Sequence, residues 1–233
     1  MFLGWCSAAP LHVLIDAGHG GTDRGAVHNH LNEADITLNV ALKLKAKLQN
    51  DPRFKVSLTR DRDETVSLED RSNKANHLKA DVFLSIHVNS SPDTRARGVE
   101  FYFQNQLPPD EESMYLAAQE NAQSIDNPEK AAEKNELTTI LDDLKNNHRI
   151  WASSQLAKSL LSKWELTKKS RAHSIRQAPF HVISNVDMSS TLVELGFISQ
   201  RSEALKLARA DQQDEMADKL YRGLLEYKEI VDK

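Results

Sequence analysis

Apolar residues along the chain form two kinds of pattern, short continuous runs and stripes that recur every three or four positions. The runs, many of them rich in branched residues, predict buried or half-buried strands at 11–15, 54–59, 82–86, 98–103, 178–183 and 191–198. The stripes predict amphipathic helices over 33–48, 68–78, 112–123, 137–160 and 211–229. Strands that alternate with helices are typical of the α/β class, and we predict a single α/β domain over residues 11–233.

One segment, residues 105–148, interrupts this alternation. It opens with Pro108-Pro109, carries a polar patch at 124–128 and contains the helix-like stretch at 112–123. A long polar segment between two core elements is typical of an insertion, and we predict a helical insertion here. Residues 1–10 lack the basic start and the apolar length of a complete signal peptide, so we interpret them as a cloning remnant or the stub of a removed signal.

Composition narrows the possible functions. A chain of 233 residues with 39% hydrophobic residues can bury one core, which favours one domain with an insertion over two domains. The net charge of -4 argues against a nucleic-acid surface, and no apolar run is long enough to span a bilayer. The single cysteine, Cys6, excludes a cluster of thiolate ligands, so a metal would be held by nitrogen and oxygen.

Two histidines follow predicted strands, and one glutamate begins a predicted helix. His19 lies in the glycine-rich loop after the run at 11–15, and His87 ends the run at 82–86. Glu33 follows Asn32, a suitable N-cap, and Asp35 can complete a capping box. Sites in open α/β sheets gather outside the carboxyl ends of the strands. Two imidazoles and one carboxylate are a typical ligand set for catalytic zinc, and they leave one position open for water.

Each of these three residues also has a simpler interpretation. His19 can bond to loop backbone, and His87 can pack at the end of its strand. Glu33 is favoured in a first helical turn by the helix dipole alone. His28 and His30 are rival nitrogen ligands, but we expect them to be exposed because no strand fixes their loop. The joint placement of the three residues, rather than any one of them, indicates a metal site.

Glu194 is a further candidate, because it is a carboxylate inside the apolar run 191–198. Such a group is costly to bury without a partner. As a general base it would take a proton from the attacking water and return it to the leaving amine. The alternative is a structural ion pair, with Arg171 or Arg176 as the partner.

Five motifs together resemble, in order and spacing, the zinc-dependent N-acetylmuramoyl-L-alanine amidases of the amidase-3 type. The resemblance covers the chain from Leu11 to Lys233. The motifs are Asp16-Ala17-Gly18-His19-Gly20-Gly21, the helix at Glu33, Thr59-Arg60-Asp61-x-Asp63 with Leu68-x-x-Arg71-x-x-x-Ala75-Asn76, Ser85-Ile86-His87-x-Asn89, and Leu192-Val193-Glu194-x-Gly196-Phe197-Ile198-Ser199.

The resemblance implies a mostly parallel twisted sheet flanked by helices and one zinc ion held by His19, Glu33 and His87. It also implies that Glu194 is the catalytic acid and base. The implied reaction is hydrolysis of the amide between N-acetylmuramic acid and L-alanine of peptidoglycan, in the periplasm or cell envelope, during separation of daughter cells. Asn89 and Arg60 are candidates for positioning the substrate, although structural roles are the more common ones for such loop residues.

The insertion resembles the one in cell-division amidases of diderm bacteria, in which a helix covers the zinc until an activator protein displaces it. In this chain the corresponding helix contains residues 116–122, and we expect Glu120 to reach the zinc as an inhibitory ligand. The alternative is a solvated helix rich in Gln and Glu. Two other functions also stay open: a zinc peptidase that cuts within the stem peptide, and a non-catalytic protein that binds the cell wall.

Overall fold

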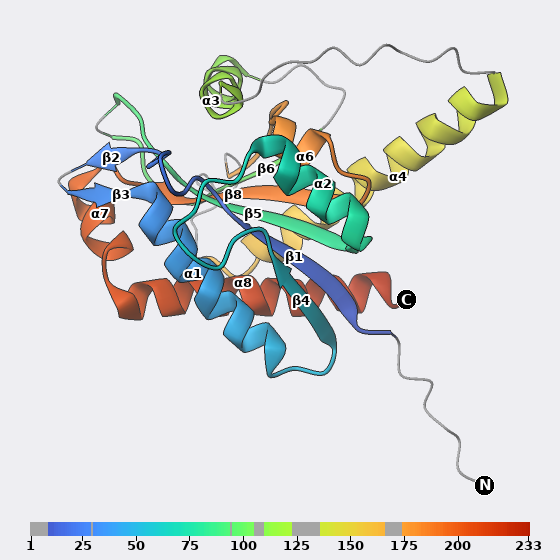
Figure 1. Ribbon diagram of the computed structural model, residues 1–233, viewed down its shortest axis with the longest axis horizontal. Helices are drawn as coiled ribbons and strands as arrows, with labels where there is room; N and C mark the ends of the chain where they lie inside the picture. Colours follow the sequence, from blue (N-terminus) through green and yellow to red (C-terminus); the bar gives the residue numbers. More distant parts are fainter. Residues whose placement is uncertain (1–8, 29, 94, 105–109, 123–135, 166–173) are drawn as a thin grey trace, which may run out of the picture.

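The computed structural model describes residues 9–28, 30–93, 95–104, 110–122, 136–165 and 174–233. The predictions for residues 1–8, for the polar patch at 124–128 and for Arg171 lie outside this part of the chain. None of the helices in the described ranges is long and apolar enough to cross a bilayer. The α/β class is confirmed, and Figure 1 shows a central sheet with helices on both sides.

The central sheet has six strands in the order β4-β1-β5-β8-β6-β7. Their bounds are β1 Leu11–Ala17, β4 Phe54–Leu58, β5 Val82–Asn89, β6 Glu100–Phe103, β7 Ile175–Gln177 and β8 Ser189–Phe197. β4, β1, β5 and β8 are mutually parallel, β6 is antiparallel to β8, and β7 is parallel to β6. The sheet is therefore mostly parallel, as expected. A small antiparallel ladder joins β2, Val27–His28, to β3, Leu31–Asn32.

The strand order has a topological switch point between β1 and β5. From β1 the chain passes through α1, Glu33–Gln49, to β4 on one side of β1. It then passes through α2, Leu68–Leu78, to β5 on the other side. Chain connections thus diverge at β1 and β5, and in open α/β sheets ligands bind at such a switch point, outside the carboxyl ends of the strands.

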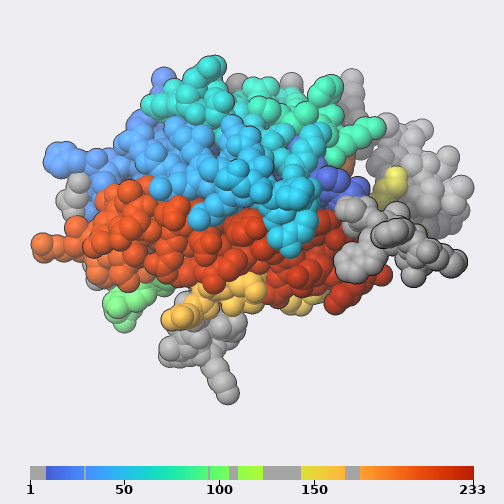
Figure 2. All heavy atoms as spheres, turned by 90° about the horizontal axis from the view of Figure 1, so that it is seen from below, coloured from blue at the N-terminus to red at the C-terminus, as the bar shows by residue number. Residues whose placement is uncertain are grey.

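Helices cover both faces of the sheet and bury two apolar clusters. Leu44 of α1, Leu156 of α4 (Glu136–Leu161) and Leu220 of α8 (Ala210–Val231) belong to the larger cluster. Figure 2 shows α1 and α8 side by side on this face. On the other face, Ala75 of α2 and Leu116 of α3, Glu111–Asn121, pack in the second cluster. The side of the sheet that carries α2 is therefore the side that α3 covers.

Local capping begins the two helices nearest the site. The Asn32 side chain accepts a hydrogen bond from the Asp35 backbone N–H at the start of α1, as predicted, and Ser67 accepts one from Asp70 at the start of α2. Such caps satisfy N–H groups that have no partner within the helix. The side chain of Glu33 is thereby held in the first turn of α1, at the end of the sheet.

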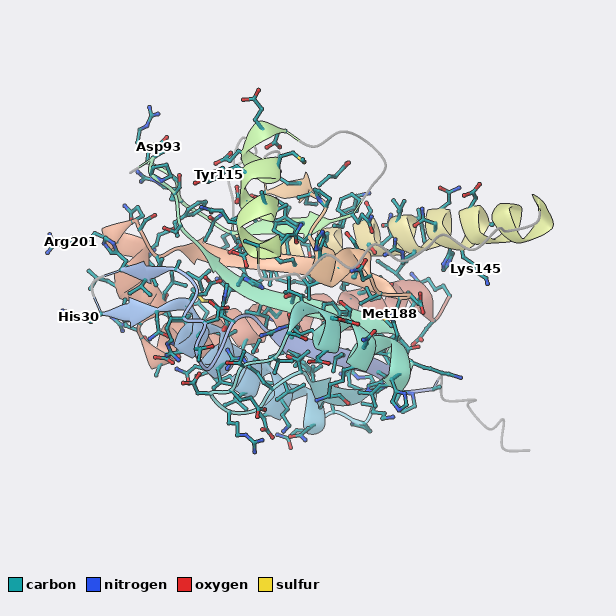
Figure 3. The ribbon with its side chains drawn as sticks, turned by 45° about the horizontal axis from the view of Figure 1, so that its top comes forward. His30, Asp93, Tyr115, Lys145, Met188 and Arg201 are labelled. Atoms are coloured by element: carbon teal, nitrogen blue, oxygen red, sulfur yellow. The ribbon has the colours of Figure 1, made fainter. Side chains whose placement is uncertain are left out.

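Two details of the sequence prediction are wrong. Residues 178–183 were expected to form a strand, but β7 precedes them and α6, His181–Ser184, follows Pro179. Val182 and Ile183 are apolar because α6 buries them against the α2 side of the sheet. The predicted helix over 137–160 was expected to bury its apolar stripe, but two residues of that stripe, Leu144 and Trp151, are exposed. The early part of α4, marked by Lys145 in Figure 3, reaches beyond the sheet. α7, Arg201–Leu207, completes the fold.

Candidate metal centre

The loop after β1 holds His19 in an unusual backbone conformation. His19 has φ +59°, in the left-handed region that non-glycine residues rarely adopt. Two buried arginines fix this loop: Arg71 donates hydrogen bonds to the carbonyls of Ala17 and His19, and Arg60 donates to those of Ala17 and Gly18. Their hydrogen bonds hold the carbonyl groups in place, so the imidazole of His19 projects from a rigid support.

The structure brings His19, Glu33 and His87 together as the sequence predicts. His19 Nε2 lies 3.1 Å from Glu33 Oε2, and His87 Nδ1 lies 3.0 Å from Glu33 Oε1. The two imidazole rings meet edge to face, with centroids 4.9 Å apart. All three side chains are buried. The carboxylate of Glu33 also accepts hydrogen bonds from the backbone N–H groups of Ala26 and Val88, which fix its orientation.

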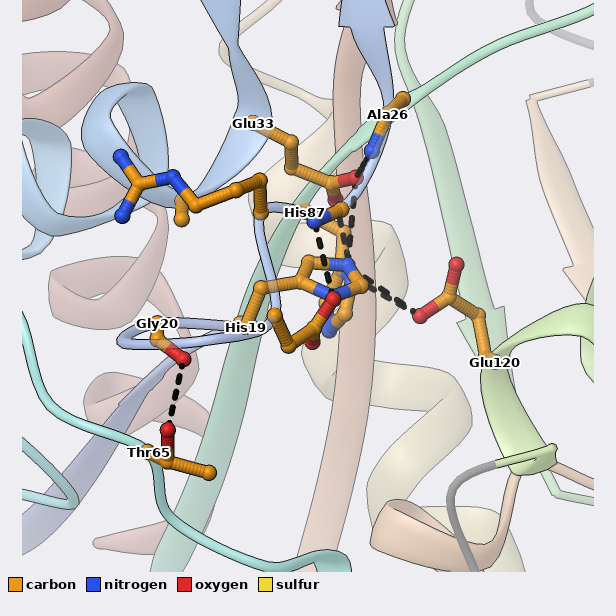
Figure 4. Close-up of polar contacts among 12 residues, drawn as sticks. His19, Gly20, Ala26, Glu33, Thr65, His87 and Glu120 are labelled. Atoms are coloured by element: carbon orange, nitrogen blue, oxygen red, sulfur yellow. Dashed lines mark hydrogen bonds and ion pairs between the residues drawn. The ribbon is translucent and has the colours of Figure 1, made fainter.

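Glu120 of α3 reaches the same two histidines from another side. Its Oε2 lies 3.4 Å from both His19 Nε2 and His87 Nδ1, and Figure 4 shows these contacts. The ligand atoms of His19, His87 and Glu120 all lie within 4.8 Å of one another, a grouping that could hold a metal ion. The expected approach of Glu120 to the site is thus present in the structure, and the helix that carries it covers this end of the sheet.

Three carboxylates, those of Asp23, Glu33 and Glu120, lie beside the imidazoles of the site. Burial lowers the pKa of His19, but Glu33, Asp23 and Glu120 outweigh this effect and raise that pKa to about 11. Burial raises the pKa of Glu33, but His19 and His87 reverse this and bring it well below its usual range. Burial and the nearby Glu33 raise the pKa of Glu120. An additional positive charge among these groups would therefore be stabilising.

These residues fit a zinc ion. A tetrahedral zinc with bonds of about 2.0–2.1 Å to nitrogen and oxygen separates its ligand atoms by about 3.3 Å. The contacts of 3.0 to 3.4 Å among the four side chains match this spacing. His19 Nε2 is buried and has no hydrogen-bond partner among the described residues, although two carboxylate oxygens lie nearby. A nitrogen and two carboxylate oxygens that lie close together without forming a hydrogen bond are the arrangement expected around a shared metal ion.

Asp23 is a functional candidate that our sequence reasoning missed. Its Oδ2 lies 2.5 Å from Nδ1 of His19, on the ring side opposite the ligand nitrogen. A carboxylate in this position fixes the orientation of a ligating imidazole and makes it a stronger ligand. The signal in the sequence was an aspartate four residues after a candidate ligand, inside the same glycine-rich loop.

Glu194 lies on β8, directly beside His87. The two residues are partners in the parallel register of β5 and β8, so their side chains point to the same face of the sheet. Glu194 is 1% exposed, and its Oε2 has no hydrogen-bond partner in the described part of the chain. Burial, together with Glu33, Glu120 and Glu100, raises its pKa well above the usual value. A buried carboxyl group with a raised pKa is suited to a role in proton transfer.

Asn89 and Arg176 belong to a polar network around Glu100. Asn89 Nδ2 and the Tyr102 hydroxyl donate to Glu100 Oε2, at 3.2 and 2.9 Å. Arg176 Nε lies 3.2 Å from Glu100 Oε1. The structural alternative for Glu194, an ion pair with Arg176, is therefore not favoured, because Arg176 pairs with the neighbouring carboxylate of Glu100. Sequence reasoning gave no role to Glu100.

The other candidates lie apart from the ligand cluster or in structural positions. Arg60 is buried, and its guanidinium also donates to the carbonyls of Ala34 and Arg62, which favours the structural alternative for it. Asn89 donates to Glu100, a contact that also supports a structural role. His28 and His30 lie on or beside the β2-β3 ladder, and neither belongs to the group of side chains that could hold a metal. His28 is half-buried, which is less exposed than expected.

Comparison with known proteins gives one family match. The model of the Amidase_3 family, described as N-acetylmuramoyl-L-alanine amidase, matches residues 13–226. N-acetylmuramoyl-L-alanine amidase AmiC of Escherichia coli is 30% identical over 220 residues, which are 94% of this chain and 53% of AmiC. The Haemophilus influenzae protein named "Probable N-acetylmuramoyl-L-alanine amidase AmiB" is 32% identical over 228 residues, 94% of this chain and 52% of that protein. The chain thus spans about half the length of these two relatives.

Solved structures show the same fold. The crystal structure of N-acetylmuramoyl-L-alanine amidase from Clostridium difficile aligns with a TM-score of 0.68 at 26% sequence identity. The alignment covers 94% of this chain and 97% of the solved one. The sheet and its flanking helices are therefore shared over almost the whole length of a catalytic protein of this kind.

Proposed function

The chain belongs to the Amidase_3 family of N-acetylmuramoyl-L-alanine amidases, and we propose that it hydrolyses the amide between N-acetylmuramic acid and L-alanine in peptidoglycan. One observation carries the proposal. His19, Glu33 and His87 converge at the switch point of the sheet, and Glu194 lies in register beside His87. These are the groups that hydrolysis of an unreactive amide requires, a metal site and a proton carrier.

We propose that His19, Glu33 and His87 hold one zinc ion. When bound, zinc polarises the amide carbonyl and lowers the pKa of a water molecule to about 7. Asp23 keeps the ring of His19 in its ligating orientation, and the N–H groups of Ala26 and Val88 keep the carboxylate of Glu33 in place. Elemental analysis of the purified chain, before and after treatment with a chelator, tests this. A chain whose activity survives complete removal of metal would contradict it.

Glu194 carries the proton in this proposal. Its carboxylate takes a proton from the attacking water, and its carboxyl group then gives the proton to the departing nitrogen of L-alanine. Burial and neighbouring carboxylates raise the pKa of Glu194, which favours the protonated form that the leaving amine needs. The place of Glu194 on a central strand limits its movement, so water and leaving group must both be bound on the same face of the sheet.

The products distinguish this activity from the two alternatives. Digestion of peptidoglycan by the amidase releases peptides with a free L-alanine amino terminus, which mass spectrometry identifies. A zinc peptidase would instead cut within the stem peptide and leave L-alanine attached to the sugar. A protein that only binds the wall would release neither product. Detection of a new terminus within the peptide would therefore contradict our proposal and favour the peptidase.

We further propose that α3 inhibits the enzyme until an activator protein displaces it. The contacts of Glu120 with His19 and His87 support this, because a carboxylate in the open coordination position excludes the substrate and its water. α3 packs on the sheet through Leu116 and Ala117, whereas Met114 and Tyr115 are exposed and accessible to another protein. The solvated-helix alternative does not account for a glutamate directed at two buried imidazoles.

The substrate locates the protein in the cell envelope, and we propose the periplasm and the separation of daughter cells as its setting. This finer part of the proposal is supported by the similarity of the insertion to that of cell-division amidases. Deletion of the gene in its host tests it by microscopy. We expect chains of unseparated cells, and normal separation in cells that lack related amidases would contradict this role.

A further inference from the structure

A row of polar side chains continues from the metal centre across the sheet to β7. His87, Glu194 and Glu100 are paired in register across β5, β8 and β6. Tyr102, two positions after Glu100 on the same strand, is paired with Arg176 of β7. Residues paired in register point to the same face, and so do residues two positions apart on one strand. Arg176 therefore lies on the face of the sheet that carries Glu194.

Arg176 joins the sheet to the inhibitory helix. Its Nε lies 3.2 Å from the buried Glu100. Its Nη1 donates to Glu112 Oε2 at 2.7 Å and lies 3.6 Å from Asp110 Oδ1, and both of these acids belong to the start of α3. The side chains of Glu112 and Asp110 are more than half exposed, whereas that of Arg176 is 17% exposed. α3 thus presents one carboxylate to the metal ligands, from Glu120, and another to Arg176.

The distance between the metal ligands and Arg176 is suited to a short peptide. Glu112 and Glu120 are eight positions apart on one helix, which corresponds to about 12 Å along its axis. Glu194 and Arg176 are separated by two strand spacings and by the two-residue step from Glu100 to Tyr102, which together correspond to about 12 Å between their backbones. An extended peptide advances about 3.3–3.6 Å per residue, so about three residues cover this distance. A peptide that starts at the scissile amide would bring its third residue to Arg176.

We propose that Arg176 determines specificity by binding a carboxylate on the peptide part of the substrate, near the third residue from the scissile amide. Glu112 occupies this place while α3 covers the site. A guanidinium can bind a carboxylate through paired, charge-assisted hydrogen bonds, and Arg176 already forms one charge-assisted hydrogen bond with Glu112. Glu100 beneath it holds the guanidinium in position when α3 moves away. This inference rests on the proposed amidase function.

Two synthetic muramoyl tripeptides with amidated carboxyl termini test the inference, one with a free side-chain carboxylate on its third residue and one with the side-chain carboxamide. The measurement is the ratio of kcat/KM for the two substrates, with the zinc-loaded full chain. We expect the acid to be preferred by about tenfold or more. Arg176→Gln should reduce the ratio to about one, through a higher KM for the acid. Arg176→Lys should retain part of the preference, which guards against a folding defect as the cause.

Glu112→Gln is the matched control, because it breaks the same contact but keeps Arg176. If Arg176 only fastened α3, both Arg176→Gln and Glu112→Gln would raise the rates on both substrates and leave the ratio unchanged. Our proposal requires that Glu112→Gln keep the preference for the acid substrate and that Arg176→Gln lose it. A ratio that persists in Arg176→Gln would overturn it.

A binding measurement separates this inference from the proposed function. Calorimetry of the free tripeptide acid and its amide needs no turnover. Binding that prefers the acid only when Arg176 is present, without hydrolysis of either muramoyl peptide, would reject the amidase and retain the acidic-peptide site. Hydrolysis with an acid preference independent of Arg176 would do the reverse. Absence of both hydrolysis and acid-selective binding would reject both.

Discussion

At the scale of single residues, the site depends on positions where the backbone has almost no freedom. His19 and Gly25 both have positive φ, at +59° and +63°. A Cβ atom at Gly25 would lie 2.5 Å from Glu33 Oε2 and 2.7 Å from Cδ2 of His19. The missing side chain of Gly25 is therefore the space in which a ligand carboxylate and a ligand imidazole meet.

We predict that Gly25→Ala weakens zinc binding about 10- to 100-fold, because the new methyl group displaces Glu33 or His19. The strained backbone should also cost about 1–3 kcal/mol of stability. Competition with a zinc chelator measures the affinity. Gly98→Ala is the control, since Gly98 has φ +103° but no described atom within 4 Å of a Cβ there. Equal loss of zinc affinity in the two variants would contradict the prediction.

Glu194 differs from the ligands because its expected effect is on turnover alone. Glu194→Gln keeps the shape of the side chain but cannot carry the proton, so kcat should fall about 10²- to 10⁴-fold. Zinc content should stay unchanged, since Glu194 is not one of the three proposed zinc ligands. Kinetics and elemental analysis of the same sample test this. A parallel loss of zinc would instead indicate that Glu194 supports the metal site.

At the scale of elements, α3 is held to the domain by contacts of different kinds. Leu116 and Ala117 pack in the second apolar cluster, and Asn121 donates to the Pro179 carbonyl. Glu112 pairs with Arg176 at one end, and Glu120 approaches the metal ligands at the other. Several separate contacts of modest strength suit a helix that must leave when a partner binds.

We predict that Glu120→Ala raises the basal hydrolysis rate about 10- to 100-fold. The variant loses an interaction with charged groups worth about 1.5–3 kcal/mol, which shifts the population toward the open site. Hydrolysis of peptidoglycan in the absence of any activator measures the effect. Gln119→Ala, an exposed change on the same helix, should leave the rate unchanged. An unaltered rate in Glu120→Ala would show that α3 does not inhibit through this residue.

At the scale of the whole molecule, one buried ion pair connects three strands to α2. Asp16 of β1 accepts hydrogen bonds from Thr59, after β4, from Ser85 of β5 and from Arg71 of α2, each at 2.7 Å. Arg71 in turn holds the carbonyls of the His19 loop. The guanidinium of Arg71 thus contributes both to the stability of the strands at their carboxyl ends and to the geometry of the metal site.

We predict that Asp16→Asn costs about 3–5 kcal/mol at pH 7, because it leaves the charge of Arg71 buried without its partner. Burial raises the pKa of Asp16, but Arg71, Ser85 and Thr59 outweigh it and lower that pKa below 3.8. A carboxyl group with a depressed pKa stabilises the fold above its ordinary pKa and loses this contribution as the pH falls through the folded value. The difference between wild type and variant should therefore be full at pH 7 and 5 and shrink below pH 3.8. Denaturant unfolding at each pH measures it, and a difference independent of pH would contradict the prediction.

Sequence patterns by themselves determined the class of the fold, most of the strands and helices, and the cap at Asn32. They also identified His19, Glu33 and His87 as residues that belong together. These features are local, since hydrophobic periodicity and capping depend on neighbours a few positions away. Candidate ligands could be found because strand ends and a helix start can be located in a sequence, and parallel strands bring their carboxyl ends to one edge.

Only the tertiary structure decided which distant residues meet. Residues 178–183 carry an apolar pattern, but packing against α2 makes part of them a short helix. The strand order places Glu100 beside Glu194 and brings Arg176 to Glu112, residues separated by 64 positions in the sequence. Asp23 beside His19 and Glu120 opposite it likewise depend on how a loop and an inserted helix fold over the sheet. Local patterns constrain the backbone of each element, whereas contacts across the sheet follow from the packing of the whole chain, which no local pattern contains.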